Sequence, residues 1–140
     1  MDDQAFQPGT PEQVLHEQAT VLMAGGPFTN KRGNAYLTND RILFADVKFD
    51  ADSIGAGLAG WLEGFRKERP PMVDMPLADV TKVWHLKKLT VRDIVVVESS
   101  SGEARFSTGY GAWTPLLRRV LQERHGRTVV DDGPEGFSVS

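Results

Sequence analysis

The apolar stripe near the C-terminus is the clearest element of this sequence and constrains its fold most strongly. Five apolar residues recur at the spacing of one helical face: Trp113, Leu116, Leu117, Val120 and Leu121. Because proline is tolerated in the first turn of a helix, Pro115 predicts a helix start near residues 112–114. Gly126 is the residue type expected just beyond the helix end.

Most of the remaining sequence is typical of short strands bounded by turn residues. We expect strands at 18–24, 35–38, 42–47, 72–75, 80–86, 91–97 and 103–108. Asn39 and Asp40 separate two of these runs and predict a tight hairpin, since both residues tolerate positive φ. Alternating strands and helices are missing. The pattern therefore favours a small antiparallel sheet or barrel with the C-terminal helix packed over its opening.

Composition is consistent with one globular domain. The chain has 140 residues, of which 40% are hydrophobic and 25% charged, enough for a single core. It has no cysteine, which excludes disulfides and thiolate metal sites. No apolar run approaches the roughly 20 residues of a membrane span. Residues 1–4 do not resemble a secretory signal, so we expect a cytoplasmic protein, with peripheral membrane binding as an alternative.

Charge is unevenly distributed along the chain. Residues 1–17 contain Asp2, Asp3, Glu12 and Glu17 but no lysine or arginine, and the last residues are also acidic. Apolar periodicity is weak at both ends. We therefore expect a flexible acidic segment at 1–12, a folded domain at 13–126 and a flexible tail at 127–140. The middle lacks the dense basic stripe that phosphate neutralisation requires, so nucleic acid is not expected as a partner.

One stretch carries a family resemblance. Residues 33–44, Gly-Asn-Ala-Tyr-Leu-Thr-Asn-Asp-Arg-Ile-Leu-Phe, resemble the signature hairpin of GRAM domains. Pro76 to Val80, Val95 to Phe106 and the Trp113–Leu117 segment are similar to later parts of that family in pattern. From the residues themselves, we expect the polar side chains of the hairpin to be structural, with Arg41 pairing with a carboxylate or a turn carbonyl.

The resemblance implies a pleckstrin-homology-like (PH-like) fold: a seven-stranded, partly open antiparallel barrel of two sheets, capped by the C-terminal helix. It also implies a non-enzymatic module that binds membrane lipid or protein and needs no cofactor. The glycine-rich, partly helical insertion at about 50–70 departs from the family pattern. So does the absence of a dense basic cluster within one loop.

The insertion supports two further hypotheses. Residues 55–60 match G-x-G-x-x-G, but no strand precedes them and aspartates would repel a phosphate, which leaves nucleotide binding as a remote alternative. The same segment contains an amphipathic patch with a basic edge that could contact a partner, a second copy of the chain or a membrane. Its residues are Leu58, Trp61, Leu62, Phe65, Arg66 and Lys67. The alternative is that its apolar face packs on the domain itself.

Basic residues in predicted loops and strand ends are the candidates for binding anionic lipid. They are Lys31, Arg32, Lys82, Lys87, Lys88 and Arg92. No catalytic pattern is present, and the three histidines lack metal-ligand spacing. We expect Trp84 and Trp113 to be core aromatics. The sequence thus predicts a non-catalytic binding module for anionic lipid, with protein binding or self-association through 54–65 as the alternative.

Overall fold

The computed structural model describes residues 3–23, 31–45, 72–87, 93–107, 110–133 and 136–140. The first half contains η1 (Asp3–Phe6), β1 (Val14–Leu22), β2 (Lys31–Thr38), β3 (Arg41–Ala45), β4 (Val73–Pro76) and η3 (Leu77–Asp79). The second half contains β5 (Val80–Lys87), β6 (Asp93–Ser99), β7 (Gly102–Ser107), α2 (Tyr110–Glu123), β8 (Val129–Asp131) and β9 (Gly136–Val139). The insertion at 50–70 lies outside the described residues.

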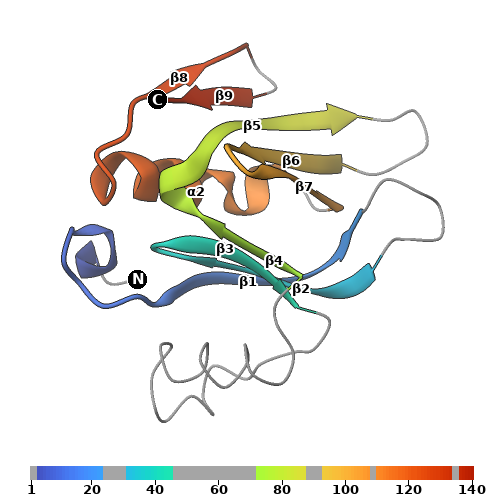
Figure 1. Cartoon of the computed structure of the whole chain (residues 1–140), viewed down its shortest axis with the longest axis horizontal. Helices are drawn as coiled ribbons and strands as arrows, with labels where there is room; N and C mark the ends of the chain where they lie inside the picture. The colour runs from blue at the N-terminus through green and yellow to red at the C-terminus, as the bar shows by residue number, and fades with distance from the viewer. Residues whose placement is uncertain (1–2, 24–30, 46–71, 88–92, 108–109, 134–135) are drawn as a thin grey trace, which may run out of the picture.

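The strands pair antiparallel in the order β4-β3-β2-β1-β7-β6-β5-β9-β8. Two halves of this sheet meet at one corner, where Leu22 of β1 is the register partner of Phe106 of β7. The outermost described strands, β4 and β8, do not pair with each other, so the sheet is not closed (Figure 1). This confirms the predicted mainly antiparallel, open β structure with one C-terminal helix. The described residues form nine strands rather than the expected seven, because β8 and β9 extend the sheet beyond β5.

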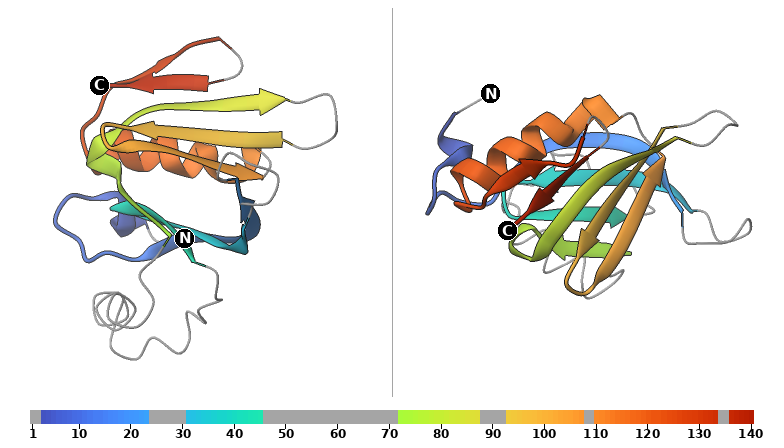
Figure 2. Two further views of the ribbon diagram at one scale, coloured as in Figure 1. Left: turned by 45° about the vertical axis from the view of Figure 1, so that its right-hand side comes forward. Right: turned by 90° about the horizontal axis from the view of Figure 1, so that it is seen from above.

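The core lies where α2 packs against the inner side of the sheets (Figure 2). Three aromatic rings join its parts: Phe44 of β3 lies 6.1 Å from Phe106 of β7, and Phe106 lies 6.0 Å from Trp113 of α2 in an edge-to-face arrangement. Burial of each such side chain contributes about 1.5–3 kcal/mol. The apolar stripe of the helix is confirmed as its buried face, because Trp113, Leu117 and Leu121 are all at most 4% exposed.

The helix begins earlier than its proline suggests. It starts at Tyr110, so Pro115 lies inside it, in the second turn. A proline there cannot bond to the carbonyl of the residue four positions before it, and its ring crowds that residue. In this chain that residue is Gly111, where an added Cβ would meet no atom within 4 Å. Gly126 lies beyond the end with φ +61°, as expected of a residue that stops a helix.

Both ends of the chain are folded where they were expected to be flexible. At the N-terminus, η1 places Ala5 and Phe6 in the core, each 1% exposed. At the C-terminus, β8 and β9 extend the second sheet, and Phe137 is 2% exposed. These contacts correct the expectation of two solvated tails. The error arose because one isolated aromatic residue per end has no periodicity to reveal its burial.

Candidate functional site

Three of the predicted lipid-binding residues, Lys31, Arg32 and Lys87, lie at one end of the sheet. Lys31 begins β2 opposite Leu22, the last residue of β1, and Lys87 ends β5 opposite Asp93, the first residue of β6. These strand ends lie on the same side of the molecule (right in Figure 1). Lys31 and its neighbour Arg32 are exposed. Lys88 and Arg92 lie outside the described residues.

Lys82 does not lie with this group. It is five residues before the end of β5, about 16 Å away along an extended strand. Its Nζ lies 5.8 Å from the ring centroid of Trp84, a cation–π contact on the outer face of the sheet. Trp84 is therefore partly buried outside the core, which corrects its expected role as a core aromatic. Its indole nitrogen is buried without a hydrogen-bond partner.

A β-bulge explains how β5 presents its side chains. Simple alternation would place Val80 on the same face as Lys82 and Trp84. The register with β6 shifts between Val80 and Lys82, so Val80 joins Val83 in the core and both are 0% exposed. A bulge adds one residue to one strand, so the side chains before it point to the opposite face of the sheet from the one that simple alternation gives.

The predicted partner-contact residues lie outside the described residues. They are Leu58, Trp61, Leu62, Phe65, Arg66 and Lys67.

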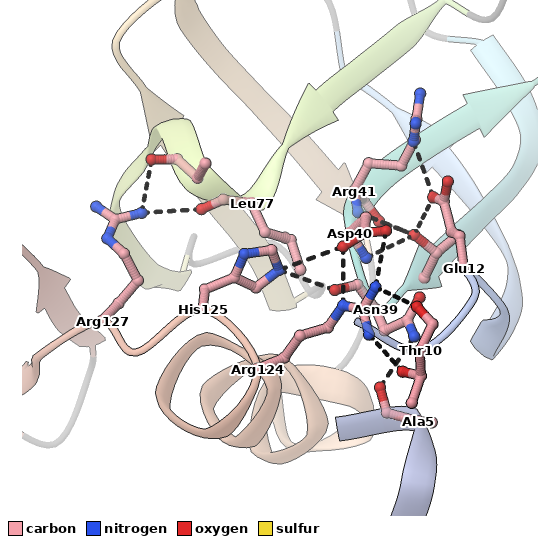
Figure 3. A network of polar contacts seen from close by, with 12 residues as sticks. Ala5, Thr10, Glu12, Asn39, Asp40, Arg41, Leu77, Arg124, His125 and Arg127 are labelled. Atoms are coloured by element: carbon pink, nitrogen blue, oxygen red, sulfur yellow. Dashed lines mark hydrogen bonds and ion pairs between the residues drawn. The ribbon is translucent and has the colours of Figure 1, made fainter. Parts of the chain in front are cut away.

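The opposite end of the molecule contains a dense polar network (Figure 3). Its centre is Asn39 in the β2–β3 turn, which is 0% exposed. The Asn39 side-chain amide donates to the carbonyls of Ala5 at 2.9 Å and Pro11 at 3.1 Å, and its oxygen accepts the N–H of Gln13 at 2.9 Å. The turn therefore holds the N-terminal segment in place with all these groups satisfied.

Arg124, just after α2, forms the second part of this network. Its guanidinium donates to both carboxylate oxygens of Asp40, at 2.8 and 3.1 Å. It also donates to the carbonyls of Gln7 and Thr10, at 2.8 and 2.7 Å, and to the Thr10 hydroxyl at 2.5 Å. The side chain is only 8% exposed. One guanidinium thus joins the helix end, the hairpin turn and the N-terminal segment.

Thr38 and Arg41 complete the hairpin. The Thr38 hydroxyl accepts the backbone N–H groups of Asp40 and Arg41 and donates to the Glu12 carboxylate at 2.6 Å. Arg41 donates to Glu12 at 2.8 Å and to Asp74 at 3.4 Å. Burial lowers the pKa of Arg41, but the hydrogen bonds and charges of Glu12 and Asp74 outweigh that effect and raise the pKa above its ordinary value. The predicted structural role of the hairpin, including carboxylate pairing by Arg41, is confirmed.

Two further side chains secure the chain after the helix. His125 donates from Nε2 to the Asn39 carbonyl at 2.8 Å. Arg127 donates to the carbonyls of Leu77, Ala78 and Val80, at 2.9, 2.8 and 2.8 Å. These basic residues bind backbone carbonyl oxygens of the β2–β3 turn and of the segment that joins η3 to β5. The network is a structural clamp. The sequence did not reveal the roles of Arg124 and Arg127, because their partners are distant in the chain.

A cleft lies elsewhere, between α2 and the β8–β9 hairpin. It has a volume of about 460 Å³ and is lined by residues that include Pro115, Arg118, Asp131, Gly133 and Phe137. Arg118 forms an ion pair with Asp131 and lies 5.0 Å above the Phe137 ring.

Among the residues described, no cluster of histidine and carboxylate side chains could hold a metal ion. None of the described helices is long and apolar enough to cross a membrane.

Comparison with known proteins gives limited similarity. No family model matches the sequence, and no curated protein matches it. Among solved structures, a Vps36 N-terminal PH domain is similar, with a TM-score of 0.47 and 13% sequence identity over 89% of each chain.

Proposed function

We propose that this chain is a non-catalytic, GRAM-type binding module that docks reversibly on an anionic lipid surface. The proposal rests on the free positive charge at the strand ends. Lys31 and Arg32 are exposed and form no ion pair with any described residue, and the backbone of Lys87 lies at the same end of the sheet. Each basic residue near an anionic surface adds about 1 kcal/mol, which suits weak and reversible binding.

Most of the other described arginines are neutralised. Carboxylates pair with Arg41, Arg105, Arg118, Arg119 and Arg124. Their positive charges are therefore compensated locally and attract an anionic surface weakly. Only the strand-end group combines exposure with uncompensated charge among the side chains described. This contrast supports the strand ends as the lipid-facing side of the module.

The absence of catalysis is part of the proposal. The GRAM-like hairpin contributes its polar side chains to the clamp, where Asp40 faces Arg124 and Asn39 is fully buried. A carboxylate held by a guanidinium is poorly suited to accept a substrate proton. The resemblance of residues 33–44 to GRAM domains and the PH-like topology both favour binding over chemistry.

Flotation with vesicles of phosphatidylcholine and phosphatidylserine tests the proposal. We expect binding at low salt that is largely lost at about 0.5 M salt, because salt screens exposed charges. The double variant K31A/R32A should bind at least about tenfold more weakly.

The matched control is S101D/Q122E, which lowers the net charge by the same amount at the opposite end of the domain. Ser101 and Gln122 are both exposed. This control should bind like the natural chain. Salt-insensitive binding, or equal loss in both double variants, would show that the strand ends are not the lipid-facing side.

A further inference from the structure

The outer side of the β2–β3 pair has buried apolar side chains that do not belong to the core. Register pairing places Tyr36 of β2 directly opposite Leu43 of β3, so the two side chains share one face of the sheet. Their sequence neighbours Leu37 and Ile42 are core residues and point inward. Alternation therefore directs Tyr36 and Leu43 outward, yet these two residues are 2% and 1% exposed.

Burial on this outer face is strongest over β3 and is lost at β1. Ala45, the last residue of β3, lies on the same face opposite Asn34 and is 2% exposed. Ala19 of β1 is the partner of Asn34 on its other side and is exposed. The material that buries the face is therefore centred on β2 and β3.

The strands themselves do not explain this burial. An antiparallel sheet without a covering layer leaves its outward side chains in contact with water. In Figure 1, α2 and the strands β5 to β9 lie on the inner side of β1–β4, and Tyr36 and Leu43 are outside the core that α2 covers. Both residues are buried within a single chain, so the covering layer is a part of this chain other than its described elements.

Residues 46–71, which contain the insertion, are attached beside this face. They directly follow Ala45 and are directly followed by Met72, whose N–H donates to the Phe44 carbonyl at 2.9 Å. Both flanking residues therefore lie at the end of β3, where burial of the outer face is strong. The sequence between them has an apolar stripe at helical spacing: Ile54, Leu58, Trp61, Leu62 and Phe65.

We propose that the outer face formed by Tyr36, Leu43 and Ala45 is the docking site of the insertion, which packs on it through the apolar stripe of residues 54–65. The face and the stripe are both apolar, and their contact removes both from water. The stripe is then a third layer of the domain and contacts neither a membrane nor a partner protein. This docking goes beyond lipid binding at the strand ends and does not depend on it.

Thiol reactivity in the full chain tests whether the stripe is covered. The natural chain has no cysteine, so L62C and E63C each introduce one thiol, within the stripe and on the opposite side of the same helical turn. We expect a thiol-reactive aromatic disulfide to modify L62C at least about tenfold more slowly than E63C in buffer, and both at similar rates in denaturing urea. Equal rates in buffer would overturn the proposal.

The same assay distinguishes the other possible occupants. Docking within the chain predicts that L62C is equally protected at all protein concentrations and without lipid. Protection that rises with protein concentration would assign the stripe to a second copy of the chain. Protection that requires phosphatidylserine vesicles would assign it to a membrane. Either result would overturn the proposal and leave the salt-sensitive flotation test of the strand ends unaffected.

Fluorescence quenching tests where the stripe docks without substituting a buried residue of the face. Glu17 is the register partner of Tyr36, and Glu103 is exposed on β7. A bimane dye at E17C is quenched by an indole ring that contacts it, so adding W61F should raise its emission at least about twofold. The matched control, the same dye at E103C, should not respond to W61F. An unchanged emission at E17C would mean that the stripe docks elsewhere and would overturn the proposal.

Discussion

The guanidinium of Arg124 closes on the carboxylate of Asp40, which lies 84 residues earlier in the chain, with Nε–Oδ1 and Nη2–Oδ2 distances of 2.8 and 3.1 Å (Figure 3). This bidentate pair joins the end of the only long described helix to the turn of the GRAM-like hairpin. Charge-assisted bonds in this parallel arrangement are stronger than neutral ones and specify geometry. The pair therefore fixes how the helix sits across the first sheet.

Removing this guanidinium should destabilise the domain substantially. In R124A, Asp40 and the carbonyls of Gln7 and Thr10 lose their partner in a partly buried setting. We expect the free energy of unfolding, measured by urea denaturation, to fall by about 2–4 kcal/mol. The control R105A removes an exposed pair with Glu103 and should change stability by less than about 0.5 kcal/mol. Similar losses in both variants would contradict the clamp.

The amide of Asn39 should be irreplaceable by a carboxylate of the same shape. In N39D the donor to the Ala5 and Pro11 carbonyls becomes a buried acceptor facing two oxygens. We expect a loss of about 3 kcal/mol or more at neutral pH, seen as a lower urea midpoint with an unchanged m-value. N34D, in the preceding strand β2 and only partly buried, serves as control and should stay within about 1 kcal/mol of the natural chain.

Two glycine-to-alanine substitutions should have opposite signs. A Cβ at Gly33 would lie 2.2 Å from the carbonyl oxygen of Ala45, so G33A must push β2 and β3 apart. We expect a loss of about 2 kcal/mol or more. At Gly111, in the first turn of α2, a Cβ meets no atom within 4 Å, so G111A should gain about 0.5–1 kcal/mol through helix propensity. Thermal unfolding of the two variants measures both changes in stability. A G33A variant more stable than the natural chain would contradict the close approach of β2 and β3 at Gly33.

Truncation of Phe6 tests whether the N-terminal segment belongs to the folded domain. Its ring is 1% exposed and lies beneath the guanidinium of Arg119, at 3.9 Å from the ring centroid. We expect F6A to lose about 3–4 kcal/mol and F6L about 1 kcal/mol, because leucine refills most of the volume. If chemical denaturation shows F6A to be as stable as the natural chain, the N-terminal segment does not contribute to the hydrophobic core of the domain.

The sequence predicted those elements whose signal is local. The helical stripe from Trp113 to Leu121 and the Asn39–Asp40 turn are patterns within one element, and both are confirmed. The bulge after Val80 was missed because it depends on how β6 pairs with β5. Of the candidate lipid-binding residues, the structure brings Lys31, Arg32 and Lys87 to one end, whereas Lys82 lies elsewhere.

By itself, then, the amino-acid order determined a mainly antiparallel domain with one covering helix, since strand and helix periodicities are written in neighbouring residues. Tertiary structure alone decided the roles of Phe6, Arg124 and Phe137. Each is an isolated side chain whose partners are distant in sequence. Whether such a residue is buried, clamped or exposed depends on surfaces that exist only after the sheets and helix have assembled.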